Sequence, residues 1–563
     1  MQIGVKYSAG GKPRRFLLWV PKEYNSRVKS ATSGTAAWNA KENAWSTPLD
    51  PTIIRHVLQQ IPDIEIHKEL RMYLDSLMNK QKLVSDIAVI DDPLDVTCRL
   101  YPFQRASVRV LDTAKRMILG HEPGLGKTPI LCSTLDYSGC SVGRNLIVCP
   151  SSVKWSWVSH LREWAGIDDI VVVESQKVDA QDVDLIYRDH KKKLSHMLTN
   201  EEAKTIVIGY EMMRKLSKTL EYADYDSIIF DESHRIKNRK ALTTQAAQRL
   251  QGNSAHIWLA TGTPVRKDYD DLFTQLSMVD PDRFTSYWNF AAIHLDTVRN
   301  HFGGTDIVGL KDKQGFNAMM SSYLYQKRKV DVLPELPEKI YTPMEIPMVN
   351  TQDVFYRKLE KEARVLLTDG TPWTSQSVLE KIMALRQAAL CPSIIGGPAG
   401  SAKLQVINEL VEDLMSSGEQ FLIFTCFRGF LDLLGELLYR KKVPTGVIHG
   451  GISSEQRYRI QQDLTNGEIA GIIGTTQSMG EGMNLQAAST AIFCDLDWVP
   501  SVNTQAEDRI HRATTKTSPN IITLRHPRTI EDDILSACKR KEEIVEDSIG
   551  KVEVMRELLR RTG

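Results

Sequence analysis

The sequence predicts an α/β protein of two lobes, each a parallel sheet flanked by helices, with helical insertions and a small α+β domain at the N-terminus. Two separate blocks of the 563-residue chain alternate short apolar runs with longer amphipathic stretches. Most of the apolar runs end in polar or turn-forming residues, and a glycine-rich loop follows the first run of the first block. Continuous apolar strands with helices between them are typical of a parallel sheet covered on both faces.

Composition supports an ordinary globular protein. Hydrophobic residues make up 42% and charged residues 25% of the chain, and the net charge is +1. The eight cysteines include no C-x-x-C pair, which argues against a zinc site and a disulfide framework. No apolar run approaches the ~18 residues of a spanning helix, and the N-terminus lacks the apolar core of a signal peptide. We therefore expect a soluble, intracellular monomer with no membrane and no zinc partner, cytoplasmic in a bacterial or viral setting and nuclear in a eukaryotic one.

An N-terminal accessory domain is predicted over residues 1–95. The segment "RRFLLWVP" predicts a strand, and "WNAKENAWSTP" predicts a hairpin whose polar turn separates two tryptophans. The segments "PTIIRHVLQQI" and "IEIHKELRMYLDSLMNK" have helical spacing. Residues 1–48 hold eight Lys/Arg and two Glu, a balance of +6, which indicates a nucleic-acid contact. The DNA-binding candidates here are Arg14, Arg15, Trp38 and Trp45. A solvated surface, with the tryptophans packing a hairpin, is the alternative.

The two strand–helix blocks are predicted over residues 96–280 and 401–545. Strands of the first are expected in "RMIL" (116–119) and at 145–150, 205–210, 227–232 and 256–263. Strands of the second are expected at 421–427, 445–451, 470–476, 490–497 and 520–526. Residues 281–338 are predicted as a mostly helical protrusion, and residues 339–400 as the start of the second lobe with a second helical protrusion. "DVLPELPEK" is predicted as a rigid turn between the two helical stretches, and residues 546–563 as a C-terminal helix.

A phosphate loop is predicted directly after "RMIL". Its residues are Gly124, Leu125, Gly126, Lys127 and Thr128. Glycines let backbone N–H groups turn toward a phosphate, and the N-terminus of the following helix adds partial positive charge. Lys127 suits the β- and γ-phosphates of ATP, and the Thr128 hydroxyl suits Mg²⁺. The strict phosphate-loop pattern has a glycine where this chain has His121, and an ordinary structural turn is the alternative.

An acidic motif, "IIFDESH", ends a strand of the same block. Phosphoryl transfer to water needs a carboxylate on Mg²⁺ and a group that orients the water. Asp231 suits the first role and Glu232 the second. In isolation the motif also fits a turn that ends a strand.

An arginine motif, "QAEDRIHRAT" (505–514), lies near the end of the second block. Arg509 and Arg512 are three residues apart, which we expect to place them on one helix face. Arginines supplied in this way stabilise charge in the transition state of other nucleotide hydrolases. The alternative is a surface helix with ion pairs from Glu507 or Asp508 to Arg512.

Further candidates lie at predicted strand ends and loops. Gln104 in "YPFQ" suits the hydrogen-bonding edge of adenine. Small hydroxyl-bearing loops and one lysine suit backbone phosphates of DNA. These DNA-binding candidates are Ser151, Ser152, Lys154, Thr261, Thr263, Thr475 and Thr476. Plain turns are the alternative for each loop taken alone.

In this order the motifs resemble the superfamily-two helicases, and more narrowly the Swi/Snf family of DNA translocases. The resemblance covers roughly residues 96–540 and rests on "EPGLGKT", "DESHRIKN", "LATGTP", "DVLPELPEK" and "QAEDRIHR". Within the family, "CPSSVKWSW", "DESHRIKN" and "QAEDRIHR" are most similar to the annealing-helicase (HARP-type) branch. The N-terminal "WNAKENAWS" is similar to the HARP module of that branch.

The resemblance implies two RecA-like lobes with ATP and Mg²⁺ bound between them and double-stranded or branched DNA as the partner. It implies catalytic roles for Lys127, Asp231 and Glu232 of the first lobe. From the second lobe it implies Gln505, Arg509 and Arg512 as catalytic residues and Gly480 and Glu481 as nucleotide-binding residues.

Three departures from the family pattern stand out. His121 replaces an aspartate, Pro123 stands where methionine is common, and "HRATTK" replaces the usual His-Arg-Ile-Gly-Gln. A histidine of ordinary pKa, ~6.5, is mostly neutral at pH 7. We therefore expect the His121→Asp variant to retain ATPase activity.

The function predicted from the sequence is an ATP-dependent translocase on double-stranded DNA that remodels branched DNA by branch migration, fork regression or strand annealing. One alternative is a helicase that separates DNA or RNA strands. The other is a catalytically silent DNA-binding scaffold, whose signature would be the loss of Lys127, Glu232 or Arg512. All three residues are present.

Overall fold

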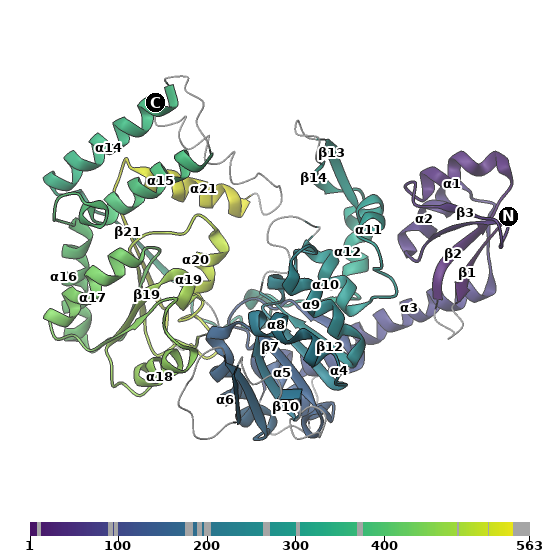
Figure 1. The fold of residues 1–563 in the computed structure, drawn as a ribbon, viewed down its shortest axis with the longest axis horizontal. Coiled ribbons are helices and arrows are strands. Elements are labelled where there is room, and N and C mark those ends of the chain that lie inside the picture. The colour runs from purple at the N-terminus through teal and green to yellow at the C-terminus, as the bar shows by residue number, and fades with distance from the viewer. Residues whose placement is uncertain are drawn as a thin grey trace. The chain divides into compact units, whose positions relative to one another are not determined.

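The computed structural model describes residues 1–7, 13–87, 94, 100–174, 184–187, 194–195, 197, 204–262, 269, 271–299, 305–368, 375–480, 483–515 and 517–543. The chain forms two units, which are described separately (Figure 1). The first contains residues 1–122, 126–149 and 157–328, and the second contains residues 123–125, 150–156 and 329–563. The predicted C-terminal helix at 546–563 lies outside the described residues, and the predicted division into six segments stays a prediction.

The N-terminal domain is a five-stranded sheet in the order β3-β4-β2-β1-β5. Its strands are β1 (Gln2–Tyr7), β2 (Pro13–Trp19), β3 (Ala37–Asn39), β4 (Ala44–Pro48) and β5 (Glu65–Ile66). Its helices are α1 (Asn25–Ala31), α2 (Pro51–Gln60) and α3 (Lys68–Ile87). The predicted hairpin is confirmed, because β3 and β4 are antiparallel with Trp38 opposite Trp45. The second predicted helix begins only at Lys68, since the residues before it pair with β1 as β5.

An eight-stranded parallel sheet, which together with its helices we call lobe 1, has the order β15-β6-β12-β11-β7-β10-β8-β9. Its strands are β6 (Arg116–Leu119), β7 (Asn145–Cys149), β8 (Ile170–Glu174), β9 (Asp184–Tyr187), β10 (Thr205–Gly209), β11 (Tyr225–Asp231), β12 (Ser254–Ala260) and β15 (Leu324–Tyr325). Its helices are α4 (Pro102–Ala114), α5 (Lys127–Tyr137), α6 (Lys154–Ala165), α8 (Tyr210–Leu220), α9 (Leu242–Leu250) and α10 (Asp271–Val279). All five strands predicted for this block are confirmed.

The first insertion, residues 281–338, is less helical than predicted. It contains α11 (Tyr287–His294), α12 (Lys313–Met320) and α13 (Lys329–Val332). Between α11 and α12 runs an antiparallel hairpin of β13 (Leu295–Arg299) and β14 (Thr305–Leu310). The β-branched residues of both strands favour extended backbone. The insertion then returns to lobe 1, where β15 pairs with β6.

A six-stranded parallel sheet, which together with its helices we call lobe 2, has the order β16-β21-β20-β17-β19-β18. Its strands are β16 (Ile340–Glu345), β17 (Phe421–Thr425), β18 (Thr445–Ile448), β19 (Gly471–Thr475), β20 (Thr490–Phe493) and β21 (Asn520–Arg525). Its helices are α14 (Asn350–Thr368), α15 (Ser375–Leu390), α16 (Ala402–Ser417), α17 (Arg428–Arg440), α18 (Ser454–Thr465), α19 (Thr476–Met479), α20 (Pro500–Glu507) and α21 (Ile530–Glu543). All five strands predicted for this block are confirmed. The sixth, β16, is an edge strand, a position that tolerates its Pro343.

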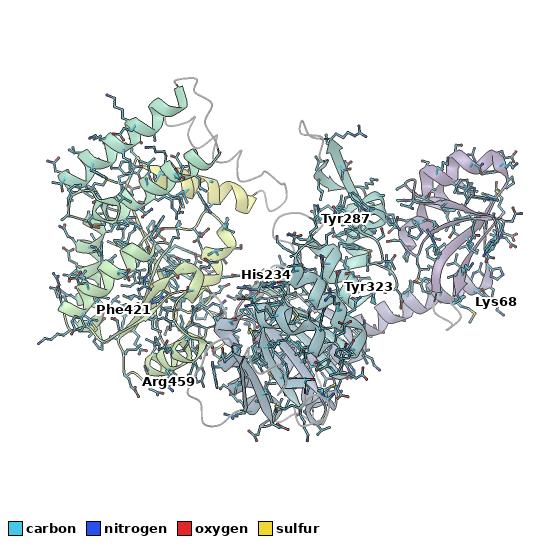
Figure 2. All side chains as sticks on the ribbon, in the orientation of Figure 1. Lys68, His234, Tyr287, Tyr323, Phe421 and Arg459 are labelled. Atoms are coloured by element: carbon cyan, nitrogen blue, oxygen red, sulfur yellow. The ribbon has the colours of Figure 1, made fainter. Side chains whose placement is uncertain are left out.

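Buried apolar strands form the core of each lobe. In lobe 1, β7 and β8 are buried at every position, as a sheet covered on both faces requires. In lobe 2, the rings of Phe424 in β17 and Phe493 in β20 stack with centroids 4.8 Å apart. Phe421, labelled in Figure 2, is the buried first residue of β17. Among the helices that the structure describes, none is long and apolar enough to cross a membrane.

Candidate nucleotide-binding site

The phosphate loop and the acidic motif meet at one edge of the lobe 1 sheet. Asp231 at the end of β11 lies opposite Ala260 of β12, and Ala260 lies opposite Leu119 of β6. Only β12 therefore separates the strand that delivers the acidic motif from the strand that leads into the phosphate loop. Ligands of open parallel sheets bind at this carboxyl edge. The register brings Asp231 and the end of β6, after which the loop begins, to the same edge of the sheet.

Two glycines shape the phosphate loop. Gly124 has φ +85° and Gly126 has φ +75°, a conformation that side-chain-bearing residues rarely adopt. A Cβ on Gly126 would also lie 2.5 Å from the amide nitrogen of Gln104. Gly126 directly precedes α5, so its conformation sets how the helix N-terminus faces the loop. A side chain at this position would disturb both the turn and the packing of Gln104.

Within the loop, the Lys127 ammonium donates to the carbonyl of His121 at 2.8 Å and to that of Glu122 at 3.3 Å. These contacts hold the lysine across its own loop. Gln104 is buried beside it, and its amide oxygen accepts the Tyr101 N–H at 2.9 Å. The oxygen thereby caps α4, while the amide nitrogen faces Gly126.

Asp231 is held by three neighbours. Its carboxylate accepts the Trp157 indole N–H at 2.9 Å and the Glu232 backbone N–H at 3.0 Å. Its backbone carbonyl accepts the Tyr210 hydroxyl at 2.6 Å. Burial, followed by the charge of Glu232, raises the pKa of Asp231 to about 6, against lowering by the Trp157 hydrogen bond and Lys127. A carboxylate with a raised pKa beside a lysine is typical of a functional site.

Glu232 adopts a strained backbone. Its φ of +52° lies in the left-handed region, which costs a non-glycine residue of the order of 1–3 kcal/mol. Its carboxylate lies 3.2 Å from Nδ1 of His234 (labelled in Figure 2), which in turn lies 3.4 Å from the Thr261 hydroxyl. This chain of contacts joins the acidic motif to Thr261, the first residue after β12. Such strain is often found at active sites.

The arginine motif of lobe 2 differs from the prediction. Helix α20 ends at Glu507, so Arg509 and Arg512 do not lie on one helix face. Arg509 donates to the Gln505 carbonyl at 3.1 Å and to the Gly480 carbonyl at 2.7 Å. Both guanidinium groups also donate to the Met483 carbonyl. These bonds gather the two arginines on the segment after α19, and the chain leaves the helix to make them.

The pKa of Arg512 is lowered to about 9 by burial and by the charge of Arg509. The sequence raised the alternative that Arg512 pairs with Glu507 or Asp508. In the structure these two carboxylates pair with lysines instead. Glu507 lies 2.8 Å from Lys339, and Asp508 lies 3.0 Å from Lys339 and 2.6 Å from Lys329. Burial alone would raise the pKa of Asp508, but the two lysines hold it below its usual value.

The other strand-end candidates are positioned as follows. Ser151 and Ser152 begin a 3-10 helix (Ser151–Val153) after β7, and Lys154 begins α6. Thr475 is the last residue of β19, and Thr476 is the first of α19. Two further candidates, Thr263 and Glu481, lie outside the described residues.

The tryptophan hairpin of the N-terminal domain presents one ring to solvent. Trp38 is 50% exposed, whereas Trp45 is 8% exposed and donates its indole N–H to Asn25. The rings meet edge to face with centroids 5.8 Å apart. Trp38, Arg15 and two lysines (Lys6 and Lys41) line a shallow hollow of about 450 Å³. Only Trp38 of the pair can therefore stack on a ligand, and Trp45 supports it. Arg14 lies in β2, but its side chain is outside the described part of the structure.

Four functional neighbours were not predicted. Trp157 and Tyr210 bind Asp231, and Lys329 and Lys339 bind the carboxylates of the arginine motif. The only signal for Trp157 was its place in "CPSSVKWSW" close to a strand end. No spacing in the sequence indicates the two lysine contacts, because they cross more than 160 residues.

The donors at the sheet edge fit Mg²⁺ bound together with a nucleotide. They are the Asp231 carboxylate and the Thr128 hydroxyl. Mg²⁺ is commonly held by one or two carboxylates, with waters and substrate phosphates completing its shell. Over the ranges described, no cluster of three or more His, Cys, Asp or Glu side chains offers an all-protein metal cage.

These features define an α/β protein of two parallel-sheet lobes with a candidate nucleotide site. The sequence profile of the SNF2-related domain matches residues 55–394, and that of the helicase conserved C-terminal domain matches residues 402–514. The chain belongs to the SNF2-related domain family, and its two parallel sheets are RecA-like lobes. This confirms the family predicted from the motifs.

Curated relatives are similar over most of this chain. It is 24% identical over 477 residues to the ISWI chromatin-remodeling complex ATPase ISW1 of Saccharomyces cerevisiae, covering 80% of this chain and 40% of that protein. It is 26% identical over 514 residues to the SWI/SNF-related matrix-associated actin-dependent regulator of chromatin subfamily A-like protein 1 of Xenopus laevis, covering 88% and 50%. The chain thus spans half or less of the length of these relatives.

Among solved structures, the Sulfolobus solfataricus SWI2/SNF2 ATPase core in complex with double-stranded DNA is 20% identical. That match covers 80% of this chain and 93% of the other, with a TM-score of 0.37.

Proposed function

We propose that this chain is a Mg²⁺-dependent ATPase that moves along double-stranded DNA. The observation that carries the proposal is the register of the lobe 1 sheet, which delivers Asp231 and Lys127 to one edge with a single strand between their elements. The lysine, the raised-pKa carboxylate and the strained Glu232 are the parts that phosphoryl transfer to water requires.

Each residue has a separate task in the proposed reaction. Lys127 pairs with the phosphates, and the loop amides around Gly124 and Gly126 bind them. Asp231 and the Thr128 hydroxyl would hold Mg²⁺, which would supply positive charge to balance the phosphates. Glu232, fixed by its backbone and by His234, would orient the attacking water.

Lobe 2 supplies positive charge in this proposal. Arg509 is fixed by three carbonyl contacts, so it serves to position the segment that carries Arg512. The lowered pKa of Arg512 reflects a guanidinium short of compensating charge. An anionic phosphoryl group would supply that charge, which suits Arg512 to stabilise the transition state. Gln505 and Gly480 complete the lobe 2 part of the nucleotide site.

ATP turnover measured with blunt duplex DNA, with single-stranded DNA, with RNA and without nucleic acid tests the proposal. We expect the duplex to stimulate hydrolysis, and Lys127→Ala and Glu232→Gln to reduce it by ~10³-fold or more. Turnover no faster than that of Lys127→Ala would favour a silent scaffold. Stimulation only by single strands or RNA would favour a strand-separating helicase.

We further propose that the substrate is branched DNA, remodelled by branch migration, fork regression or annealing. The N-terminal hollow supports this, because an exposed tryptophan among cations suits an unpaired base and its phosphates. The similarity of "WNAKENAWS" to the HARP module points the same way. Ser151, Ser152 and Thr475 are proposed to contact the DNA backbone, whereas the other three candidates, Lys154, Thr261 and Thr476, are buried and do not present their side chains to a duplex.

A further inference from the structure

The contact between the N-terminal domain and lobe 1 contains a buried ion pair that the nucleotide site does not use. Asp50, 5% exposed, lies between β4 and α2. Its carboxylate accepts from Arg283 at 3.1 Å and from Nε2 of His294 at 2.8 Å. Both donors belong to the insertion of lobe 1. Ile293, beside His294, packs into the apolar core of the N-terminal domain.

Asp50 is charged in this setting. Burial alone would raise its pKa, but the Arg283 charge and the His294 hydrogen bond outweigh burial and hold the pKa well below its usual range. The same partnership raises the pKa of Arg283. A buried charge whose partner is removed is strongly destabilising. The pair therefore resists separation of the domain from lobe 1.

Asp50 also starts a helix. Its Oδ1 accepts the Thr52 N–H at 2.9 Å, which caps the N-terminus of α2. One carboxylate thus fixes the orientation of α2 and holds two side chains of lobe 1. A nearby pair, Arg55 with Asp312, joins the same two parts but is more exposed to solvent.

From Arg283 the contacts continue to the phosphate loop. Its second amino group donates to the Tyr323 hydroxyl at 3.1 Å, and that hydroxyl donates to Asp280 at 2.7 Å. Tyr323, labelled in Figure 2, directly precedes β15. Its carbonyl accepts the N–H of Ile118, and the Tyr325 carbonyl accepts the N–H of Gly120 at 2.9 Å.

The last of these contacts reaches His121. The ring of Tyr325 lies against that of His121 with centroids 5.4 Å apart, and the Lys327 carbonyl accepts the Glu122 N–H at 3.1 Å. The carbonyls of His121 and Glu122 are the ones that hold Lys127. The segment from Tyr323 to Lys327 therefore lies along the whole strand that enters the loop.

We propose that Asp50 is a positioning residue that fixes the N-terminal domain on lobe 1 and, through Arg283 and Tyr323, fixes the β15 segment that supports the phosphate loop. The N-terminal domain and the loop are then mechanically joined. We call this connection between the N-terminal domain and the phosphate loop the joint. If DNA binds the N-terminal domain, the joint predicts an effect of that DNA on ATP turnover, and this prediction rests on the proposed function. The joint itself does not depend on the proposed function.

Hydrogen–deuterium exchange of the full chain without nucleotide tests the joint. Asp50→Asn keeps an acceptor for the Thr52 N–H, since asparagine caps helices as well as aspartate does, but removes the charge that Arg283 requires. We expect amide exchange to rise roughly tenfold or more both in α2 and at residues 118–122. Asp312→Asn is the matched control. Asp312 also caps a helix, α12, and its pair with Arg55 is more exposed, so exchange at residues 118–122 should not change.

A double variant checks that the effect passes through the pair. Asp50→Asn with Arg283→Met should accelerate exchange at residues 118–122 by less than the two single variants combined, because both single variants lose the same contact between Asp50 and Arg283. Additive acceleration would contradict the pairing. Faster exchange confined to α2, with residues 118–122 unchanged, would overturn the proposed reach to the phosphate loop.

ATP turnover separates the joint from the proposed function. In Asp50→Asn we expect the ratio of DNA-stimulated to basal turnover to fall several-fold, with the melting profile of lobe 2 unchanged. Absence of turnover in the wild type would contradict the proposed function but leave the exchange result standing. An unchanged ratio together with unchanged exchange would overturn the joint.

Discussion

His121, which departs from the family pattern, is enclosed by side chains of lobe 1. The side chain is 0% exposed, its Nε2 lies 2.8 Å from the Ser107 hydroxyl, and the rings of Phe103 and Tyr325 cover it. Burial and the charges of Lys127 and Lys327 lower its pKa to about 3. The sequence argument that this histidine is neutral at pH 7 agrees with the environment, although its reason, an ordinary pKa, is wrong.

The His121→Asp variant should keep ATPase activity within about threefold of wild type, because the burial that disfavours a charge of either sign is opposed, for a carboxylate, by Lys127 and Lys327. Steady-state ATP turnover checks this, with His121→Leu as the variant that fills the site without a charge. Loss of activity in His121→Asp alone would mean that the neutral ring has a function that a carboxylate cannot replace.

Asp231 predicts a pH dependence of stability. Its folded pKa, about 6, lies above the ordinary 3.8, so the stability that comes from its protonated form is present below pH 4 and is lost as the pH rises through 6. Asp231→Asn should therefore gain roughly 1–3 kcal/mol over wild type at pH 7.5 and much less at pH 4. Urea unfolding of both proteins without nucleotide or Mg²⁺ measures the difference. A gain independent of pH would contradict the raised pKa.

At the scale of elements, ten strands of the two lobes could be predicted, since parallel strands covered on both faces need continuous apolar runs. The predicted strands include the edge strand β18 but not β8, which is internal and buried, or the edge strand β9. The edge strands β15 and β16 have two residues and an exposed, proline-containing sequence, so neither produces that pattern. The arginine motif shows the limit of spacing arguments, because α20 stops where distant carbonyls bind Arg509.

Lys339, in the segment between the two lobe sequences, gives a prediction for the stability of lobe 2. The Lys339 side chain is 12% exposed and holds both Glu507 and Asp508. Lys339→Met removes the ion-pair partner of Glu507 and one of the two lysines that hold Asp508, and should destabilise lobe 2 by about 2–4 kcal/mol. Thermal unfolding measures it, with Lys441→Met as the control because its pair with Glu412 is on the surface and contributes little. Equal melting of the two variants would contradict a structural role for the cluster.

The tryptophan hairpin predicts a change in DNA preference. Trp38→Ala should weaken binding to a forked junction with single-stranded arms roughly tenfold and leave blunt-duplex binding nearly unchanged, because the exposed ring offers stacking to an unpaired base. Fluorescence anisotropy at a stated salt concentration measures both constants. Arg15→Ala is the companion variant, because it removes a positive charge from the same hollow and keeps the Trp38 ring. Equal losses of affinity for both DNAs in Trp38→Ala would contradict a role in junction binding.

At the scale of the whole molecule, the sequence motifs predicted the family, while the site roles given to the lobe 1 residues stay predictions. Motif order specifies which strand ends meet, and a parallel sheet then brings Asp231 to the phosphate loop. Contacts that depend on three-dimensional packing could not be predicted from the sequence. Trp157 on Asp231, Lys339 on the arginine motif and Arg283 on Asp50 join residues more than 70 positions apart, with no local pattern to reveal them.

The central claim is translocation on duplex DNA powered by ATP, and displacement of a triplex-forming strand from a blunt duplex tests it most directly. We predict that wild-type protein with ATP and Mg²⁺ displaces the third strand while the duplex stays paired. We predict that Lys127→Ala leaves the third strand bound. Separation of the duplex strands, or displacement that proceeds equally with Lys127→Ala, would contradict the account.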